Sequence, residues 1–202
     1  MTAPAAALTP GVRDRIVEAA ATITAESGWA SVTMNKVAAR AGVSRQTVYN
    51  EMGSKPALGQ AMVMRELERF LAAVEEELAR YDDLVEAIRA AAERSLVMAR
   101  ENRLLDAVLA SAHGVSRGEP GSDNELLPFL TTDAAPLISA ATAVIAASLP
   151  VRFPDTGLSD HEAEVAIDSV VRLVLSHVMQ PGSPPEQVAD DIAWLVGRVL
   201  RA

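Results

Sequence analysis

The amino-acid sequence predicts an all-α fold with two domains. Aromatic residues make up only 3% of the 202 residues, whereas alanine, leucine and valine are abundant, which favours helices. Long stretches with apolar residues at three- and four-residue steps alternate with clusters of glycine and proline, and strand signals are nearly absent. Half of the residues are hydrophobic, enough to bury a sizeable core. We expect a three-helix head over residues 1–55 and a larger helical domain over residues 56–202.

The first helix of the head is predicted over residues 10–27. Its apolar residues recur at helical spacing: Val12, Ile16, Ala19, Ala20 and Ile23. Gly28 is placed to end this helix. Trp29, Val32 and Met34 come next, and we expect them to close a small core over the next two helices. A head of about fifty residues is near the lower limit for independent folding, so it should rely on contacts with the larger domain.

The stretch from Thr33 to Met52 predicts a helix-turn-helix. Thr33 and Ser44 are suited to cap its two helices, and Gly42 lies where the turn requires a left-handed backbone. The buried positions are expected to be Val37, Ala38, Ala41, Val43 and Val48. The second helix then exposes polar side chains that suit a DNA groove: Arg45, Gln46, Thr47, Tyr49 and Asn50. The alternative is a plain helical hairpin that contacts no DNA.

A long amphipathic helix is predicted from residue 56 to about residue 81. Pro56 suits its first turn, where a missing amide donor costs little. Leu67, Leu71 and Leu78 lie on its apolar side, whereas charged residues that include Glu77 are assigned to its solvated side. A helix of this length spans roughly 35 to 40 Å, so it can connect the head mechanically to the second domain.

The remaining segments predict further helices separated by two breaks. Asp82 and Asp83 open the next helix, and an apolar segment lies after it over 104–112. A glycine-rich loop over 114–124, a short helix over 125–130, a helix over 133–149 and a break over 150–157 come next. The uncharged stretch 134–151 approaches membrane-spanning length, but its prolines, serines and threonine favour a buried core helix, and no membrane association is expected.

The last two predicted helices, over 159–179 and 185–200, indicate a homodimer. Ser159 and Glu162 form a capping-box pattern at the start of a helix that is apolar on several sides. The final helix is apolar on one face, with Trp194 to the side of it. Helices with so much apolar surface need one side covered by their own domain and the other side covered by a partner. We therefore expect a four-helix bundle between two copies of the chain. The alternative is that both helices complete a monomeric core.

The charge is divided unevenly between the two predicted domains. The whole chain carries a net charge of -9. Residues 1–55 hold six basic and four acidic side chains, a net charge of +2, and the remainder holds 12 basic and 23 acidic side chains, a net charge of -11. A slightly basic head on an acidic body orients the molecule toward phosphate. Because the local excess is small, we expect two heads to act together.

Several functional classes are disfavoured by what the sequence lacks. There is no cysteine, and the three histidines are scattered, so we expect neither a metal site nor a bound cofactor. No nucleophile with an adjacent base and no phosphate-binding glycine loop after a strand is visible, which argues against an enzyme. The N-terminus does not resemble a secretory signal, and the composition suits the cytoplasm. A helical adaptor that binds only protein is the main alternative to a DNA-binding regulator.

The head resembles the TetR family of bacterial transcriptional regulators over about residues 12–62. The matching residues are Arg15-Ile16, Ala19-Ala20, Gly28-Trp29, Val37-Ala38, Ala41-Gly42-Val43-Ser44, Thr47-Val48-Tyr49, Gly53-Ser54-Lys55 and Leu58. Thr24 and Met52 depart from the pattern, since the family usually has phenylalanine at both packing positions. The resemblance implies a homodimeric repressor that binds double-stranded operator DNA and is released by a small effector in its C-terminal domain.

Residue roles are implied by the same resemblance. Thr33, Tyr49 and Lys55 match phosphate-contacting positions. The recognition helix supplies positions that face base edges or nearby phosphates, and with the capping serine the remaining DNA-binding candidates are Ser44, Arg45, Gln46, Thr47 and Asn50. Tyr49 has the alternative role of a packed aromatic at the rim. The run from Thr47 to Lys55, continuing into Met64 to Leu71, is similar to actinobacterial family members associated with alkane and long-chain lipid metabolism.

The effector is expected to be apolar and flexible. Few aromatic side chains and little interior charge suit an aliphatic ligand better than a planar cation. The candidates for an apolar pocket lining are Phe70, Val74, Leu96, Met98, Leu109, Ile138, Val144 and Val171, each of which has the alternative role of plain core. His113 and His177 are candidates for hydrogen bonds to the ligand, and for His177 the alternative is a satisfied core histidine.

Overall fold

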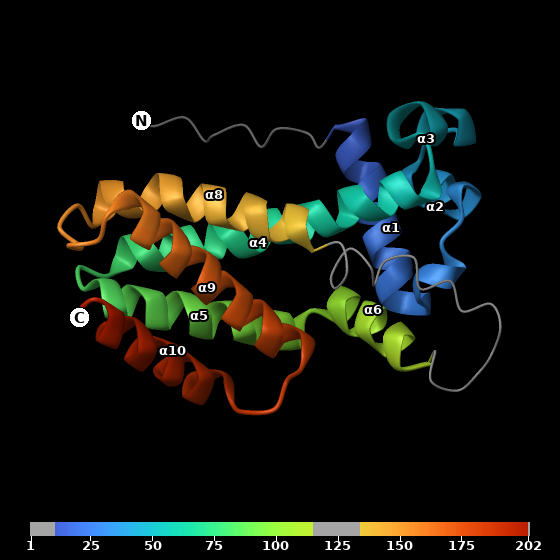
Figure 1. Ribbon diagram of the computed structural model, residues 1–202. Helices are drawn as coiled ribbons and strands as arrows, with labels where there is room; N and C mark the ends of the chain where they lie inside the picture. The colour runs from blue at the N-terminus through green and yellow to red at the C-terminus, as the bar shows by residue number, and fades with distance from the viewer. Residues whose placement is uncertain (1–10, 115–133, 202) are drawn as a thin grey trace, which may run out of the picture.

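Helix α4 (Lys55–Arg80) extends along the molecule from the head to the far end of the C-terminal body (Figure 1). The computed structural model describes residues 11–114 and 134–201, and for residues 109–114 it describes the backbone alone. Within these ranges the regular elements are helices, with no strand among them. The predicted all-α fold is therefore confirmed. The predicted loop over 114–124 lies outside the described residues except for Gly114, which is helical, and so does the predicted short helix over 125–130.

The head is built from three helices and one short 3-10 turn. These are α1 (Val12–Ser27), η1 (Trp29–Ser31), α2 (Met34–Ala41) and α3 (Arg45–Met52). Gly28 ends α1 with φ at 76°, and Gly42 ends α2 in the left-handed region with φ at 67°. These backbone angles disfavour residues with a side chain, which explains why glycine occupies both turns.

The core of the head is completed by residues from outside it. Ile16, Val37 and Val48 are fully buried, as predicted. They pack in one cluster with Leu58 and Met62 of α4 and with Leu104 and Val108 of α6 (Arg103–Gly114). The head thus relies on later helices of the chain, as its small size predicted.

The two positions that depart from the family pattern are both buried. The Thr24 hydroxyl donates to the Ala20 carbonyl oxygen at 2.8 Å and approaches the Met62 sulfur at 3.8 Å. Met52 packs in the same head cluster. Thr24 therefore satisfies its hydroxyl within its own helix and beside a flexible thioether, so the substitution keeps the core closed.

The C-terminal body packs its helices around α4 and α5. Its other elements are α5 (Leu84–Glu101), α8 (Ala135–Arg152), α9 (Asp160–Met179) and α10 (Pro185–Val199). Helix α4 packs against α5 and α8, α8 packs against α9, and α10 packs against α5. One apolar cluster joins Leu78 to Leu149 and Phe153, and another joins Leu96 to Val188 and Ile192.

Two expectations for the body were wrong in detail. Helix α8 does not end at residue 149 but continues through Pro150 to Arg152, because the Phe153 amide still donates to the Leu149 carbonyl at 2.8 Å. Glu77 is buried rather than solvated, and Arg80 Nη1 donates to both of its carboxylate oxygens. Among the described helices, α8 alone is long and apolar enough by composition to span a membrane, a test that core helices of soluble proteins also pass.

Helices α9 and α10 present apolar side chains that nothing in the described part of this chain covers. In α9 only Ile167 is buried, and Val165 on the same helix is exposed. In α10, Trp194 is 63% exposed and Leu195 is 42% exposed, and Val199 is exposed beside them. The Arg198 guanidinium lies over the Trp194 ring, 5.5 Å from its centroid, and shields only part of it. A single chain therefore leaves these two helices incompletely packed.

Candidate nucleic-acid interface and effector pocket

Helix α3 is held in place from both ends and from beneath. The Ser44 hydroxyl accepts a hydrogen bond from the Thr47 amide at 3.0 Å and caps the helix, as predicted. Val48 is 0% exposed and anchors the helix to the head core. Arg13 of α1 donates to the Glu51 carbonyl oxygen at 2.8 Å, near the C-terminal end of the helix. The orientation of α3 is thus fixed relative to α1 while its other face stays in solvent.

The exposed face of α3 carries two side-chain pairs, each spaced by four residues. Gln46 Nε2 donates to Asn50 Oδ1 at 2.9 Å. The Arg45 guanidinium lies 5.3 Å from the Tyr49 ring centroid, and Arg45 Nη2 donates to the Tyr49 hydroxyl at 3.4 Å. All four residues are exposed. Such pairs order the amides, the guanidinium and the phenol on one surface before any ligand arrives.

The other DNA-binding candidates lie around this face. Thr33 is exposed and caps α2, accepting a hydrogen bond from the Lys36 amide at 3.2 Å. Thr47 is half-buried, with its hydroxyl 2.8 Å from that of Ser44. The Lys55 ammonium lies 4.9 Å from the Trp29 ring centroid, at the start of α4. The Trp29 ring thereby holds this cation at the base of the head.

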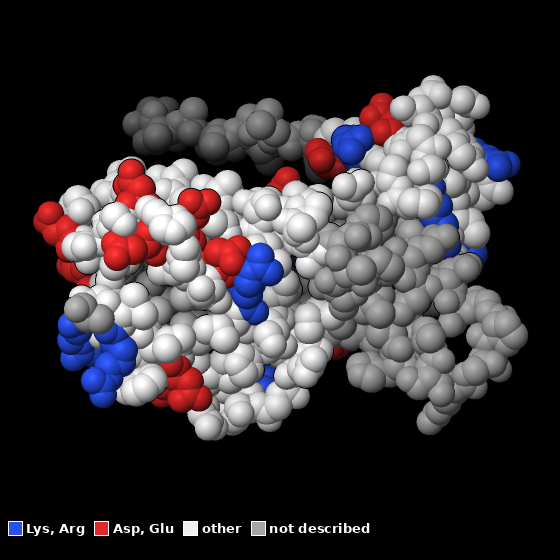
Figure 2. Space-filling model, viewed as in Figure 1, with Lys and Arg blue, Asp and Glu red and all other residues white. Residues whose placement is uncertain are grey.

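An ion pair between α1 and α2 stiffens the same region. Both terminal nitrogens of Arg40 donate to the Glu26 carboxylate at 2.7 Å. These hydrogen bonds hold the pKa of Glu26 below its ordinary value and raise the pKa of Arg40. In Figure 2, the head shows Lys and Arg side chains together with a few acidic ones. The opposite end of the body carries a group of Asp and Glu side chains near the α8–α9 connection and a separate group of Lys and Arg side chains near the C-terminal end of α10.

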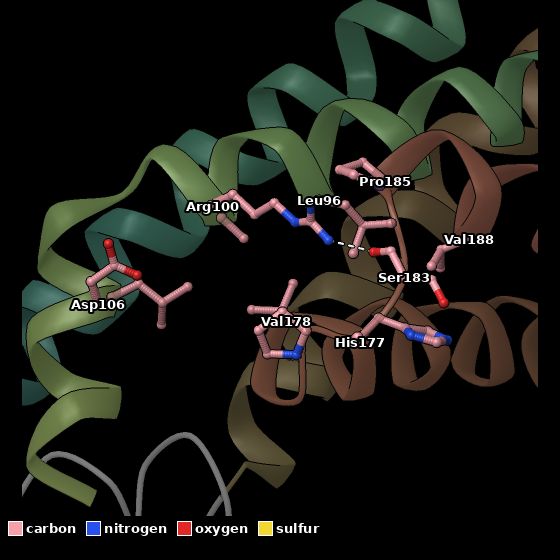
Figure 3. Close-up of a pocket in the computed structure, with 12 residues that line it drawn as sticks. Leu96, Arg100, Asp106, His177, Val178, Ser183, Pro185 and Val188 are labelled. Atoms are coloured by element: carbon pink, nitrogen blue, oxygen red, sulfur yellow. Dashed lines mark hydrogen bonds between the residues drawn. The ribbon is translucent and has the colours of Figure 1, made fainter. Parts of the chain in front are cut away.

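A small hollow in the body lies between α5, the start of α6 and the α9–α10 connection (Figure 3). Its volume is about 130 Å³. Leu96 and His177, two of the predicted ligand contacts, line it. Arg100 and Asp106 line it as well, and the Arg100 guanidinium donates to the Ser183 carbonyl oxygen across the opening. Two predicted residues that lie 81 positions apart in sequence are thereby brought together.

The other predicted ligand contacts lie elsewhere. Val74 is half-buried and packs in the cluster of α4, α5 and α8, and Ile138 is buried on α8. Half-buried positions are occupied by Phe70, Met98, Val144 and Val171. None of these six lines the hollow of Figure 3. The side chains of Leu109 and His113 lie outside the described residues.

Several contributing residues had no distinct signal in the sequence. Arg13 orients α3 through a contact 38 positions away. Arg100, Asp106 and Ser183 surround the hollow but belong to three separate segments. Leu104 and Val108 stand out in the sequence only as members of an apolar stretch, although they complete the head core. Each role depends on tertiary neighbours that helical periodicity alone does not reveal.

Comparison with known families accounts for most of the chain. Residues 16–62 match the family described as bacterial regulatory proteins, tetR family. Residues 83–198 match the family described as bacterial tetracyclin repressor, C-terminal domain. The two matches together cover the helix-turn-helix and nearly all of the body.

Individual relatives give the same result. The chain is 32% identical over 188 residues to the HTH-type transcriptional regulator AlkX of Mycobacterium tuberculosis, covering 92% of this chain and 83% of that protein. The crystal structure of the TetR family repressor AlkX from Dietzia sp. strain DQ12-45-1b, implicated in biodegradation of n-alkanes, superimposes with a TM-score of 0.75 at 26% identity, covering 96% of each chain.

A more distant structure shares the fold. The resorcinol complex of RolR aligns with a TM-score of 0.60 at 18% identity, covering 92% of this chain and 87% of that one. This family consists of DNA-binding regulators. The prediction of a helix-turn-helix and the prediction that the chain is not an enzyme are therefore confirmed, and the alternative of a helical adaptor without DNA binding is excluded. The chain belongs to the TetR family of bacterial transcriptional regulators.

Proposed function

We propose that this chain is a homodimeric repressor that leaves its operator when a small apolar effector binds the body. The observation that carries the proposal is the ordered, exposed polar face of α3 at one end of the molecule. The exposed apolar residues of α9 and α10 support pairing through residues 159–179 and 185–200, which gives each dimer two recognition helices. Residues 1–55 then read DNA in the cytoplasm, and residues 56–202 sense the effector and form the dimer.

The proposed DNA contacts divide into two groups. Thr33, Tyr49 and Lys55 contact phosphates and set the position of the head, with Ser44 and Thr47 at the start of α3. Gln46 and Asn50 face base edges, where amides pair with adenine, and Arg45 can pair with guanine or a phosphate. Support comes from the exposure of the α3 face and from the Gln46–Asn50 hydrogen bond, which presents both amides on one surface.

The effector is proposed to be apolar and aliphatic. The relatives named AlkX support this, since the Dietzia protein is implicated in biodegradation of n-alkanes. The ligand shifts the DNA-binding equilibrium only if it binds one arrangement of the two heads better than the other. Helix α4 connects the body cluster to the head core, so a displacement of α4 changes the spacing of the recognition helices.

DNA binding by the full-length chain tests the first part of the proposal. Fluorescence anisotropy with labelled DNA from upstream of its own gene should give specific binding that weakens steeply with salt. A reporter gene downstream of the same DNA should be repressed when the protein is expressed. Activation of the reporter, or no binding at low salt to any upstream fragment, would contradict the repressor assignment.

Alanine substitutions separate the two groups of contacts. Tyr49→Ala and Lys55→Ala should weaken binding to all DNA sequences alike, because phosphates carry no sequence information. Gln46→Ala and Asn50→Ala should instead change the preferred operator, with about 1 to 3 kcal/mol lost at the contacted base pair. The measurement is the anisotropy Kd on a panel of single-base operator variants. An equal loss on every variant for all four substitutions would show that the roles are assigned wrongly.

A further inference from the structure

The hollow of Figure 3 combines an apolar interior with unpaired polar groups at its rim. Leu96 and Val188 are buried and Leu105 is half-buried, and together they form much of the apolar wall. Asp106 and Arg100 are exposed at the edge, and His177 is half-buried. Among the described residues, neither the Asp106 carboxylate nor the His177 imidazole has a hydrogen-bond or ion-pair partner, whereas Arg100 is bonded to the Ser183 carbonyl.

The size of the hollow limits what it can hold. Its volume of about 130 Å³ is close to the cavity of about 150 Å³ that, in another protein, suffices to bind benzene. A ligand therefore buries about six carbon atoms, and a longer chain must extend through the open side. This is far below the volume of a typical drug-sized site, so a bulky multi-ring ligand does not fit.

The charges at the rim favour a neutral ligand with one polar end. Arg100 and Asp106 carry opposite charges, so a carboxylate is attracted by one and repelled by the other, and an amine meets the reverse. A plain alkane fills the apolar interior but gains no hydrogen bond from the Asp106 carboxylate or the His177 imidazole. A hydroxyl group can donate a hydrogen bond to the Asp106 carboxylate without bringing a charge that Arg100 or Asp106 would repel.

Helix α6 connects this hollow directly to the head. Its residues Leu105 and Asp106 line the hollow, whereas Leu104 and Val108, four residues apart on another face, are buried in the head core. Asn102 fixes the start of α6 to α4, because its Nδ2 donates to Glu66 Oε2 at 2.8 Å and its Oδ1 accepts from the Leu104 and Leu105 amides at 3.0 Å. A ligand that displaces Leu105 therefore moves residues that belong to the head core.

We propose that this hollow binds a neutral aliphatic alcohol, with about six carbons against Leu96, Leu105 and Val188 and the hydroxyl at Asp106, and that α6 transmits its binding to the head. The proposal rests on the proposed function, since it names the ligand class and the site of the effector. Transmission through α6 differs from transmission through α4 alone, because on α6 the residues that line the hollow and those that enter the head core are neighbours on one short helix.

The test uses full-length protein and three ligands of equal chain length: 1-hexanol, hexanoate and n-hexane. Methyl NMR of leucine and valine side chains should show 1-hexanol binding with a Kd of about 1 mM, as expected for seven heavy atoms. Shifts should concentrate on Leu96, Leu105, Val178 and Val188. Binding of n-hexane and hexanoate should be at least about fivefold weaker.

Two variants with matched controls locate the site. Leu105→Phe fills the hollow from α6 and should weaken 1-hexanol binding at least about tenfold, whereas Val144→Leu, at a half-buried position that does not line it, should not. Asp106→Asn should weaken 1-hexanol binding but strengthen hexanoate binding, because a repelling charge is lost. Glu101, the last residue of α5, is exposed and does not line the hollow. Glu101→Gln should therefore change neither 1-hexanol binding nor hexanoate binding.

Operator affinity measured with and without 1-hexanol separates this inference from the proposed function. The wild-type Kd for operator should rise about tenfold, and Leu105→Phe should abolish that rise while still binding DNA. Three results would overturn the inference and leave operator binding intact. They are equal 1-hexanol binding by wild type and Leu105→Phe, binding of n-hexane as tight as that of 1-hexanol, and no 1-hexanol binding up to its solubility limit. A protein that binds no operator in the absence of ligand fails the proposed function itself.

Discussion

The head and the α9–α10 layer differ in how completely a single chain packs them. In the head, most apolar residues of α1, α2 and α3 are buried in one cluster that α4 and α6 complete, although Val12 at the start of α1 is exposed. In α9, only Ile167 is buried, and α10 exposes Trp194 and Leu195. This difference indicates that contacts within one chain suffice to pack the head. The last two helices instead keep exposed apolar residues that a second protein surface must cover.

The largest expected effect tests whether the head is a closed unit. Val48→Asp places a charge without a partner at a position that is 0% exposed, which should cost about 4 kcal/mol of unfolding free energy. Operator binding should be lost, and circular dichroism should show part of the helical signal melting early. Light scattering should still find the dimer, because α9 and α10 lie outside the head cluster.

The matched variant Asn50→Asp introduces the same charge on the exposed face of the same helix. It should leave the melting curve nearly unchanged and weaken only DNA binding, by repulsion from phosphate. A Val48→Asp protein that melted like wild type would show that the head core tolerates charge and that the contrast with the α9–α10 layer is mistaken.

The second prediction addresses the open layer. Leu195→Glu replaces an apolar side chain that is 42% exposed in one chain with a charge that a dimer would have to bury. Each dimer carries the substitution twice, so its Kd should rise about 100-fold or more, with little change in the stability of the monomer. Sedimentation at several concentrations measures the shift, and Glu101→Lys on α5 serves as an exposed control. An unchanged dimer Kd would place the interface elsewhere.

The same contrast explains which features the sequence predicted well. Caps, turn glycines and buried positions of the head depend on neighbours within a few residues, so Thr33, Gly42 and Ser44 were assigned correctly from local rules. The predicted break at residue 150 and the predicted solvated position of Glu77 were both wrong. The continuation of α8 past Pro150 and the burial of Glu77 depend on tertiary packing. Proline near a helix end removes one amide donor but does not prevent the last turn from forming.

The effector site was harder still to predict, because it too depends on tertiary packing that local sequence rules do not reveal. Of the seven apolar candidates whose side chains the structure describes, only Leu96 lines the hollow of Figure 3. Core and pocket use the same apolar side chains, so composition cannot distinguish them. The polar residues Arg100 and Asp106 would have been better markers, but their convergence depends on the α5–α6 bend.

The third prediction compares a turn of the head with a turn of the body. Gly42→Ala forces a side chain into the left-handed region at φ 67°, which should cost about 1 kcal/mol and lower Tm by about 3 °C. Gly182, in the α9–α10 connection, has an ordinary φ and open space around it. Gly182→Ala should therefore be neutral or slightly stabilising through the unfolded state. Equal losses of Tm in both variants would mean that the turn conformation of Gly42 is not what selects glycine.

The smallest expected effect concerns two carboxylates, one in each region. Hydrogen bonds from the Ser159 hydroxyl at 2.7 Å and the Ser159 amide at 2.8 Å lower the pKa of Glu162, and hydrogen bonds from Arg40 lower the pKa of Glu26. Both carboxylates have a lower pKa in the folded chain than in the unfolded chain. Their stabilisation is therefore fully present above the unfolded pKa and is lost as the pH falls through the folded pKa.

Glu26→Gln and Glu162→Gln should each lower Tm slightly at pH 7 and reduce the loss of Tm on acidification below about pH 4.5, where unfolded glutamate titrates. The two differ in their response to salt. The Glu26–Arg40 pair joins two exposed charges, so about 0.5 M NaCl should shrink the effect of Glu26→Gln. The Glu162 cap bonds to uncharged donors and should respond less. Identical salt dependence would mean that both carboxylates act through long-range charge, so that a local cap in the body and an interhelical pair in the head are physically equivalent.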